Sequence, residues 1–381
     1  RMFCVLVILC VAVAAVHAAP ASTSVAPEEI RVFEPKDNGY ASCRIPGLAM
    51  TTNGTLLAWC EARHAKGGDW DPIEILLRRS TDGGRTWGEI QHIAGDGKQT
   101  YNNPVAIVDR DGGAIHFLYC VEYARCFSMR SDDDGRTFSA PVEITGTFEA
   151  FRKDYAWNVI ATGPCHGIQL RSGRLLVPVW LSTGGHSHHP SVVATIYSDD
   201  RGKTWQRGDI AVRNTMEVPN PNETVAVELA NGRVMLNCRN ESPRHRRVIV
   251  TSPDGATGWS APAFDDALVE PICNASIIRL TTAPPGDRNR IVFANPDNDV
   301  PPPPSAKRPS RNGVQSYARK DLTLRLSYDE GKTWPVSKLL DSGPTDYCDL
   351  AAGRDGTIYC LHRVAKGLTL ARIPLGWFAE P

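Results

Sequence analysis

Short alternations of apolar and polar residues recur along this chain. Examples are IEILLRRS at 73–80, VVATIYS at 192–198 and LTLRLS at 322–327. Alternation with a period of two is typical of half-buried β-strands, because successive side chains point to opposite faces. Segments with helical periodicity are nearly absent, and 28 Pro and 32 Gly indicate frequent turns. The pattern therefore predicts an all-β protein.

One short string follows several of these strands and occurs four times. It reads STDGGRTW at 80–87, SDDDGRTF at 131–138, SDDRGKTW at 198–205 and SYDEGKTW at 327–334. The shared pattern is S-x-D-x-G-x-T-W/F, an Asp-box. Its Asp can accept hydrogen bonds from turn N–H groups, and its Gly suits a positive φ. We expect a hairpin turn whose Asp is structural and whose aromatic residue packs across neighbouring strands.

A fifth, imperfect copy, SPDGATGW at 252–259, has Ala256 where the other copies have Gly. With this copy included, successive copies start 51, 67, 54 and 75 residues apart. Repeated units of this size are typical of solenoids and propellers. Units of four strands at this spacing leave room for about six along the chain. The sequence therefore predicts a six-bladed β-propeller of four-stranded antiparallel blades, which occupies residues 19–381 as a single domain.

The charge balance and the cysteines limit the classes of function. Lys+Arg and Asp+Glu both number 42, so the net charge is zero, which argues against nucleic acid or an anionic membrane as the main partner. Of the 11 cysteines, nine follow residue 18, without a C-x-x-C pair or a zinc-type spacing. We expect no metal site and no cofactor, and we expect most cysteines to be small buried residues.

The N-terminal stretch is strongly apolar. Its run from Phe3 to Val16 is too short to span a bilayer comfortably, and it ends in the small-x-small sequence Val16-His17-Ala18. We therefore expect a secretory signal peptide at residues 1–18, with a membrane anchor as the alternative. Removal of this segment would leave a monomeric protein, secreted or periplasmic, with no stable insertion in a membrane.

Three further strings lie outside the Asp-boxes. They are RIP at 44–46, GPCHGIQLRSGRLLVPVW at 163–180 and PNETVAVELANGRVMLNCR at 221–239. Together with the Asp-boxes they resemble the bacterial-type exo-α-sialidases (neuraminidases), a family with Asp-box, or BNR, repeats. The resemblance covers most of the mature chain. It implies a retaining exo-α-sialidase that removes terminal sialic acids from glycoproteins, glycolipids or oligosaccharides.

The resemblance also assigns functional residues to seven positions. The implied catalytic residues are Asp69, Glu223 and Tyr347, and the implied substrate-binding residues are Arg44, Arg63, Arg239 and Arg319. Two assignments have a competitor: Asp71 lies two residues from Asp69, and Arg325 lies in the strand after Arg319. Arg63 matches a family position near O4 of the sugar, and a plain surface arginine is the alternative.

The chemistry of a sialic acid explains these residue types. Its anomeric carbon carries a carboxylate, which a group of guanidiniums can hold, whereas such a cluster of cations repels itself without an anion. A neutral tyrosine avoids repulsion from that carboxylate, but it needs a base, for which the resemblance implies Glu223. The nearby arginines are also expected to favour the phenolate. Asp69 would protonate the leaving oxygen and then activate water, with net retention.

Two other functions remain open on the sequence. A relative of this family could transfer the sialic acid to another sugar or release an anhydro product. A non-catalytic sialoglycan-binding propeller would keep the arginines but lose the acid or the tyrosine. Cys43, Cys238 and Cys348 each adjoin a proposed site residue. Because neighbours in a strand point to opposite faces, we expect these cysteines to face away from the site, neither catalytic nor metal ligands.

Overall fold

The computed structural model of this chain describes residues 26–35, 39–64, 67–282, 288–303, 310–311 and 313–379. The segment expected to be a signal peptide, residues 1–18, lies outside the described residues and stays a prediction. Within the described part, no helix is long and apolar enough to cross a membrane.

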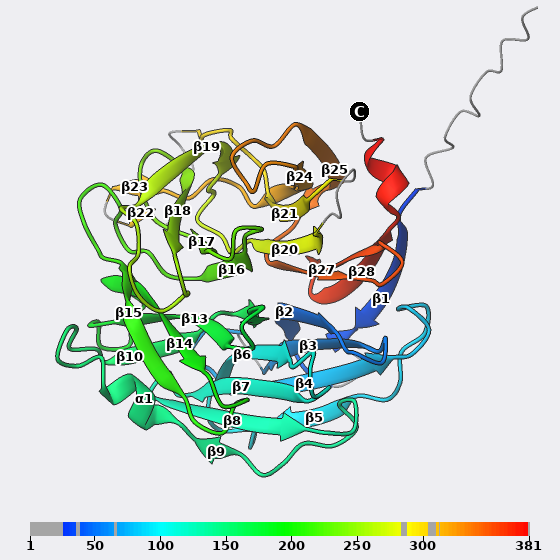
Figure 1. Cartoon of the computed structure of the whole chain (residues 1–381), viewed down its shortest axis with the longest axis horizontal. Coiled ribbons are helices and arrows are strands. Elements are labelled where there is room, and N and C mark those ends of the chain that lie inside the picture. The colour runs from blue at the N-terminus through cyan, green and yellow to red at the C-terminus, as the bar shows by residue number, and fades with distance from the viewer. Residues whose placement is uncertain are drawn as a thin grey trace, which may run out of the picture.

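Six sheets of the described residues form blades around a central axis (Figure 1). The first blade contains β2 (Ser42–Met50), β3 (Leu56–Arg63), β4 (Ile73–Ser80) and β5 (Gln91–Ala94). The second contains β6 (Tyr101–Val108), β7 (Ile115–Val121), β8 (Arg125–Ser131), β9 (Val142–Glu143) and β11 (Cys165–His166). The third contains β10 (Val159–Thr162), β12 (Ile168–Gln169), β13 (Leu175–Ser182), β14 (Ser191–Ser198) and β15 (Gln206–Val212).

The remaining blades follow in chain order. The fourth contains β16 (Thr224–Glu228), β17 (Val234–Cys238), β18 (Arg246–Ser252) and β19 (Ala263–Val269). The fifth contains β20 (Ser276–Thr281), β21 (Arg290–Pro296), β24 (Lys320–Ser327) and β25 (Val336–Pro344), with the small hairpin β22 (Ser310–Arg311) and β23 (Val314–Gln315) inserted. The sixth contains β26 (Cys348–Ala352), β27 (Ile358–Val364), β28 (Gly367–Ile373) and β1 (Glu28–Phe33). The helices are α1 (Thr145–Glu149) and a 3₁₀ helix at Leu375–Phe378.

This architecture confirms the predicted six-bladed propeller, with one difference in strand number. Two of the sheets have five strands because the inner strand of the third blade is interrupted. Its parts β10 and β12 both pair with β13, and the segment between them, β11, pairs in parallel with β6 of the second blade. The inner strands of neighbouring blades contact one another all around the axis.

The ring is closed by strands from the two ends of the described chain. β1 pairs antiparallel with β28, from Glu28 opposite Arg372 to Phe33 opposite Leu368. In Figure 1 the blue β1 and the red β28 lie side by side. The sixth blade is therefore complete only when the N-terminal strand has been added to the three C-terminal strands.

The Asp-boxes are hairpin turns, as predicted. In each of the four regular copies the Thr N–H donates to the Asp carboxylate, at 3.0, 2.9, 2.9 and 2.8 Å for Asp82, Asp133, Asp200 and Asp329. The glycine has a φ between 76° and 82° in all four. In the imperfect copy the positive φ of 76° falls on Gly255, one residue earlier, so Ala256 is not required to adopt it.

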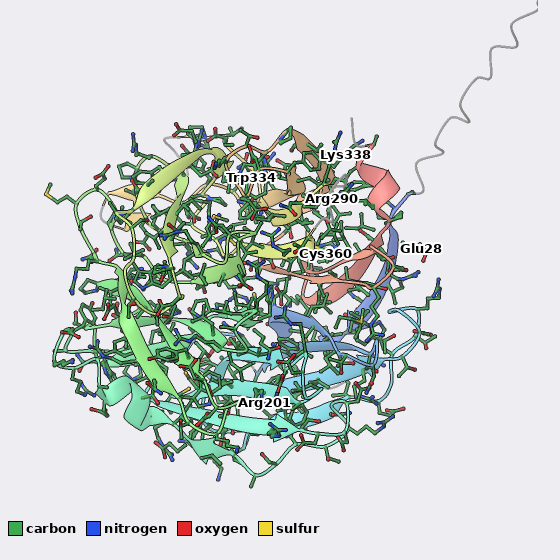
Figure 2. All side chains as sticks on the ribbon, viewed as in Figure 1. Glu28, Arg201, Arg290, Trp334, Lys338 and Cys360 are labelled. Carbon is green, nitrogen blue, oxygen red and sulfur yellow. The ribbon has the colours of Figure 1, made fainter. Side chains whose placement is uncertain are left out.

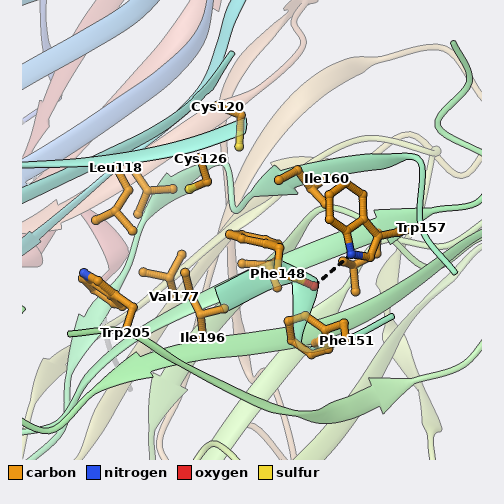
Figure 3. Close-up of a cluster of buried hydrophobic side chains, with 14 of the residues drawn as sticks. Leu118, Cys120, Cys126, Phe148, Phe151, Trp157, Ile160, Val177, Ile196 and Trp205 are labelled. Carbon is orange, nitrogen blue, oxygen red and sulfur yellow. Dashed lines mark hydrogen bonds between the residues drawn. The ribbon is translucent and has the colours of Figure 1, made fainter. Parts of the chain in front are cut away.

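Buried side chains fill the space between neighbouring blades. Between the second and third blades, Leu118 and Val177 belong to one cluster with Trp205, the aromatic residue of the third Asp-box (Figure 3). Trp157 joins this cluster and donates its Nε1–H to the carbonyl of Phe148 in α1 at 2.8 Å. Trp334 of the fourth regular Asp-box, labelled in Figure 2, donates its Nε1–H across to Asp265 of the fourth blade at 3.0 Å. The aromatic residues therefore join blades.

One buried carboxylate connects several blades near the axis. Asp349 is fully buried and accepts hydrogen bonds from the Leu48 N–H of β2 at 2.8 Å and from the Ser276 hydroxyl of β20 at 2.8 Å. Its Oδ1 also lies 2.7 Å from Nδ1 of His166. Burial alone would lower the pKa of His166, but the charge of Asp349 outweighs it and raises that pKa. The pair therefore stabilises the fold fully below about pH 6.5, and less as the pH rises through the raised pKa.

Replacement of Asp349 by Ala should lower the free energy of unfolding by about 3–5 kcal/mol, because it leaves several buried donors without an acceptor. Urea denaturation at pH 6 measures the change. The matched control is Asp266→Ala on the exposed part of β19, for which we expect less than about 0.5 kcal/mol. Equal stabilities for the two variants would show that Asp349 does not hold the blades together.

Candidate functional site

The sequence-predicted site residues meet at one end of the propeller. Tyr347 directly precedes β26 and Glu223 directly precedes β16, while Arg63 ends β3 and Arg239 directly follows β17. In an antiparallel blade the start of the inner strand and the end of the second strand lie at the same edge. A cavity of ≈ 220 Å³ at this end is lined by all seven predicted residues. They are Arg44, Arg63, Asp69, Glu223, Arg239, Arg319 and Tyr347.

The Asp-boxes lie at the opposite end of the blades. The register pairs Arg63 with Ile73 at one edge of the first blade and Leu56 with Ser80 at the other. Ser80 opens the first Asp-box, whereas Arg63 lines the cavity. The repeats therefore build the scaffold and take no part in the cavity.

Tyr347, Glu223 and Arg239 form a buried hydrogen-bonded group. The Tyr347 hydroxyl donates to Oε1 of Glu223. Nη1 of Arg239 donates to Oε2 of Glu223 and to the Tyr347 oxygen, the latter at 2.9 Å. The backbone ladder continues past the ends of β16 and β17, with the Arg239 N–H donating to the Glu223 carbonyl at 3.0 Å. The hairpin therefore fixes the acid and the guanidinium side by side.

The phenol of Tyr347 keeps its proton in this environment. Burial raises the pKa of Tyr347 well above its usual value, and the negative charge of Glu223 raises it further. Arg239 and Arg319 do lower this pKa, as the sequence suggested, but burial and Glu223 outweigh them. The arginines therefore favour the phenolate, as expected, but they do not offset burial and the charge of Glu223. Tyr347 is a hydrogen-bond donor aimed at a carboxylate that can accept its proton.

Two of the predicted arginines share a carboxylate that the sequence did not single out. Asp346 accepts from Nη2 of Arg44 at 3.2 Å and from Nη1 of Arg319 at 2.9 Å, and it also pairs with Arg363. Burial alone would raise the pKa of Asp346, but the guanidiniums of Arg319, Arg44 and Arg363 hold it well below its usual range. Three positive charges face one negative charge here, so the cluster can take a further anion.

Arg63 holds Asp69 in the lining of the cavity. Its guanidinium is buried between Glu61, at 2.6 Å, and Asp69, at 2.7 Å. Glu61 is itself fixed by the backbone N–H of Asn103 at 2.8 Å. Burial would raise the pKa of Asp69, but Arg63 outweighs it and lowers that pKa. The Asp69 side chain is 41% exposed, so it can reach a molecule in the cavity. Arg63 is therefore not a plain surface arginine.

The competing residues lie in different places relative to the cavity. Asp71 accepts from the Gly68 N–H at 2.8 Å and is not part of the cavity lining. Arg325 pairs with Asp297 at 2.5 Å and is also absent from the lining. Among the described residues, Asp69 and Arg319 are therefore the members of each pair that reach the cavity.

The cysteines beside the site face away from it, as expected. Cys43, Cys238 and Cys348 are buried in three hydrophobic clusters between strands. All nine cysteines of the described chain are free thiols. Among the described residues, no three His, Cys, Asp or Glu side chains are grouped as metal ligands.

Several residues of the cavity carried no usable signal in the sequence. Glu61, Tyr123 and Trp180 lie in or next to strands whose apolar pattern indicated only core positions. His188 lies in a loop of the third blade, far in sequence from the seven predicted residues. Asp346 directly precedes Tyr347 in the sequence. Its place beside the proposed nucleophile is the sequence feature that could have identified it.

Comparisons with known proteins found a family model and several relatives. The family described as BNR repeat-like domain matches residues 54–360. A sialidase of Micromonospora viridifaciens is 32% identical over 89% of this chain and 52% of its own length. A sialidase of Bacteroides fragilis is 27% identical over 81% of this chain and 57% of its own length. The chain thus spans little more than half of these two relatives, but it covers 87% of Sialidase-3 of Homo sapiens, at 26% identity.

Solved structures show the same fold. A Hadza microbial sialidase superposes with a TM-score of 0.76 at 26% identity, over 92% of this chain and 69% of that chain. The intramolecular trans-sialidase of Ruminococcus gnavus superposes with a TM-score of 0.71 over 91% of this chain and 97% of that chain. At 16% identity the second likeness concerns the fold alone.

Asp346→Asn should lower the free energy of unfolding at pH 7 by about 3 kcal/mol, because three guanidiniums then lack their shared anion. Since the pKa of Asp346 is depressed in the folded protein, its stabilisation is complete above the unfolded value near 3.9 and is lost as the pH falls. Urea denaturation at several pH values measures the difference between variant and wild type, which should shrink below about pH 4. Asp71→Asn is the control, and a difference that does not change with pH would contradict this role for Asp346.

Proposed function

Because this chain belongs to the bacterial-type sialidase family with BNR repeats, we propose that it is a retaining exo-α-sialidase. Its substrates would be terminal sialic acids of glycoproteins, glycolipids or oligosaccharides. The observation that carries the proposal is one cavity in which Tyr347 donates to Glu223 beside clustered arginines, with Asp69 in the same lining. That combination suits an anionic sugar and a tyrosine nucleophile.

The arginines would bind the carboxylate of the sugar. Arg319 lies with its guanidinium carbon 5.8 Å from the centre of the Tyr347 ring, so a carboxylate held there is beside the nucleophile. The side chains of Arg44 and Arg319 are 23% and 28% exposed. A planar carboxylate can accept hydrogen bonds from neighbouring guanidiniums at once. Asp346 and Glu223 hold the guanidiniums in place, so little reorganisation is needed on binding.

In the first chemical step the Tyr347 oxygen attacks the anomeric carbon as its proton moves to Glu223. Asp69 gives a proton to the glycosidic oxygen as the bond to the leaving group breaks. Because Arg63 lowers the pKa of Asp69, only the fraction of the protein with Asp69 protonated carries out this step. Arg239 contacts both Tyr347 and Glu223, so it stabilises the negative charge that is passed between them. The result is a covalent sialyl–tyrosine intermediate and a free alcohol.

In the second step the ionised Asp69 takes a proton from water, which attacks the same carbon. The bond to Tyr347 breaks, and Glu223 returns the proton to the phenol oxygen. The carbon is inverted twice, so the configuration is retained. An acceptor sugar or a hydroxyl of the bound sialic acid in place of water would give transfer or an anhydro product, and the identity of the product distinguishes these outcomes from hydrolysis.

Tyr347→Phe should lower the rate of hydrolysis of a fluorogenic sialoside by at least about 10²-fold, since the nucleophilic oxygen is removed. Release of the fluorophore measures the rate, and Tyr101→Phe, outside the cavity lining, serves as the control. A fully active Tyr347→Phe variant would exclude this nucleophile. A wild-type protein that hydrolyses no sialoside of any linkage would exclude the enzyme in favour of a non-catalytic sialoglycan-binding propeller.

Asp69→Asn should slow the hydrolysis of sialyllactose by about 10²–10⁴-fold, because a sugar alkoxide leaves poorly without a proton. The loss should be much smaller for an aryl sialoside, whose phenolate leaves more easily. Steady-state kcat/KM values for both substrates measure the contrast. The same loss for the two substrates would mean that Asp69 does not protonate the leaving group.

A further inference from the structure

A second cavity, of ≈ 610 Å³, lies at the other end of the propeller axis from the proposed catalytic cavity. It is lined by Met50, which pairs with Leu56 at the Asp-box end of the first blade. The inner strands of all six blades contribute to its wall. These strands are β2, β6, β12, β16, β20 and β26. The mechanism proposed above makes no use of this space.

Apolar side chains form much of the wall. Four of them stand at the ends of inner strands and are half-buried: Met50 in β2, Val108 in β6, Ile168 in β12 and Ala352 in β26. Ile278 of β20 also lines the cavity, with 9% of its surface exposed. A ligand with an apolar part would remove these surfaces from water, which favours binding.

The same cavity carries an excess of positive charge. Four arginines line it: Arg110, Arg171, Arg279 and Arg354. Its described lining contains one carboxylate, that of Glu228, which pairs with Arg171 at 3.1 Å. Arg279 pairs with Glu330, which is not part of the described lining. Ion pairs therefore neutralise two of the four arginines.

The other two arginines, Arg110 and Arg354, keep their charge. Each lies two residues beyond the end of an inner strand, β6 or β26, and each is exposed. Arg110 donates to the Leu170 carbonyl at 3.2 Å, and Arg354 donates to the Thr52 carbonyl. Within the described part of the chain, no ion pair joins either of them to a carboxylate. A carbonyl orients a guanidinium without neutralising it, so both charges are open to a ligand.

We propose that this second cavity binds a small amphipathic carboxylate, a medium-chain fatty acid anion. The carboxylate lies at the exposed mouth, beside Arg110 or Arg354, and the alkyl chain lies along the apolar wall. A guanidinium presents two parallel N–H groups to a carboxylate, so this head group suits the unpaired arginines. The excess of positive charge favours an anion over a neutral ligand of the same shape.

Ligand-observed NMR titrations of the wild-type protein with octanoate, butyrate and octanol at about pH 8 test this ligand class. Octanoate should bind at least about tenfold more tightly than butyrate, because it has four more CH₂ groups to bury. It should also bind at least about tenfold more tightly than octanol, which carries no charge. Added salt should weaken the binding of octanoate, because it screens the exposed guanidiniums.

A variant with both Arg110→Gln and Arg354→Gln tests the place of binding. Its affinity for octanoate should be at least about tenfold lower than that of wild type, because the carboxylate then lacks its cation. Arg85→Gln is the matched control and should bind octanoate as wild type does. Arg85 is also exposed and donates to a carbonyl, that of Asp82 at 3.0 Å, but it lies outside both cavities. Thermal unfolding shows whether each variant is folded, and Arg354→Gln alone replaces the double variant if that one is not.

Three outcomes would overturn the proposal. Equal affinities of wild type and the arginine variant would place octanoate elsewhere, for example at the arginines beside Tyr347. Equal affinities for octanoate and octanol, or binding of neither, would exclude an amphipathic carboxylate. Binding to vesicles of phosphatidylcholine and phosphatidylserine without binding of free octanoate would assign this surface to a membrane. Because each measurement reads binding, the result does not depend on whether the protein hydrolyses sialosides.

Discussion

The fold depends on one fully buried charge, the carboxylate of Asp349. Asp349 lies near the axis, where it accepts hydrogen bonds from the first and fifth blades and pairs with His166, which lies against the second. A buried carboxylate is tolerated only when such partners surround it, and each partner here is fixed by its own strand. Because Tyr347 precedes Asp349 by two residues, the interaction that joins the blades also sets the position of the phenol.

The cavity near this carboxylate is surrounded by charged side chains that form ion pairs with one another. Arg239 is held by Glu223, Arg63 by Glu61 and Asp69, and both Arg44 and Arg319 by Asp346. Each contact fixes a guanidinium that would otherwise sample many orientations. Preorganisation of this kind favours a ligand that carries charge in a fixed plane, because binding then costs little side-chain entropy.

Much of the fold and of the cavity could be predicted from local patterns. The Asp-boxes specify turns through hydrogen bonds within eight residues, and the strands before them show their alternation directly, so the blade repeat was visible. The motif around Glu223 and Arg239 lies within one hairpin, which the sequence also displays. Asp346 and Arg363 meet only through the ladder between β26 and β27, where the Arg363 N–H donates to the Tyr347 carbonyl at 3.2 Å. Contacts between blades, such as those of His188, depend on tertiary packing and cannot be predicted from a local sequence pattern.

The sixth blade is closed by β1, a strand from the N-terminal part of the described chain, so this strand affects the stability of the whole blade. Loss of Glu28–Phe33 would leave the edge of β28 unpaired and exposed to solvent, as a template for association with other chains. The inner strand of that same blade begins one residue after Tyr347. Proteolytic removal of β1, more than three hundred residues from Tyr347 in sequence, would thus disturb the blade whose inner strand positions this side chain. β1 therefore completes the blade on which Tyr347 stands.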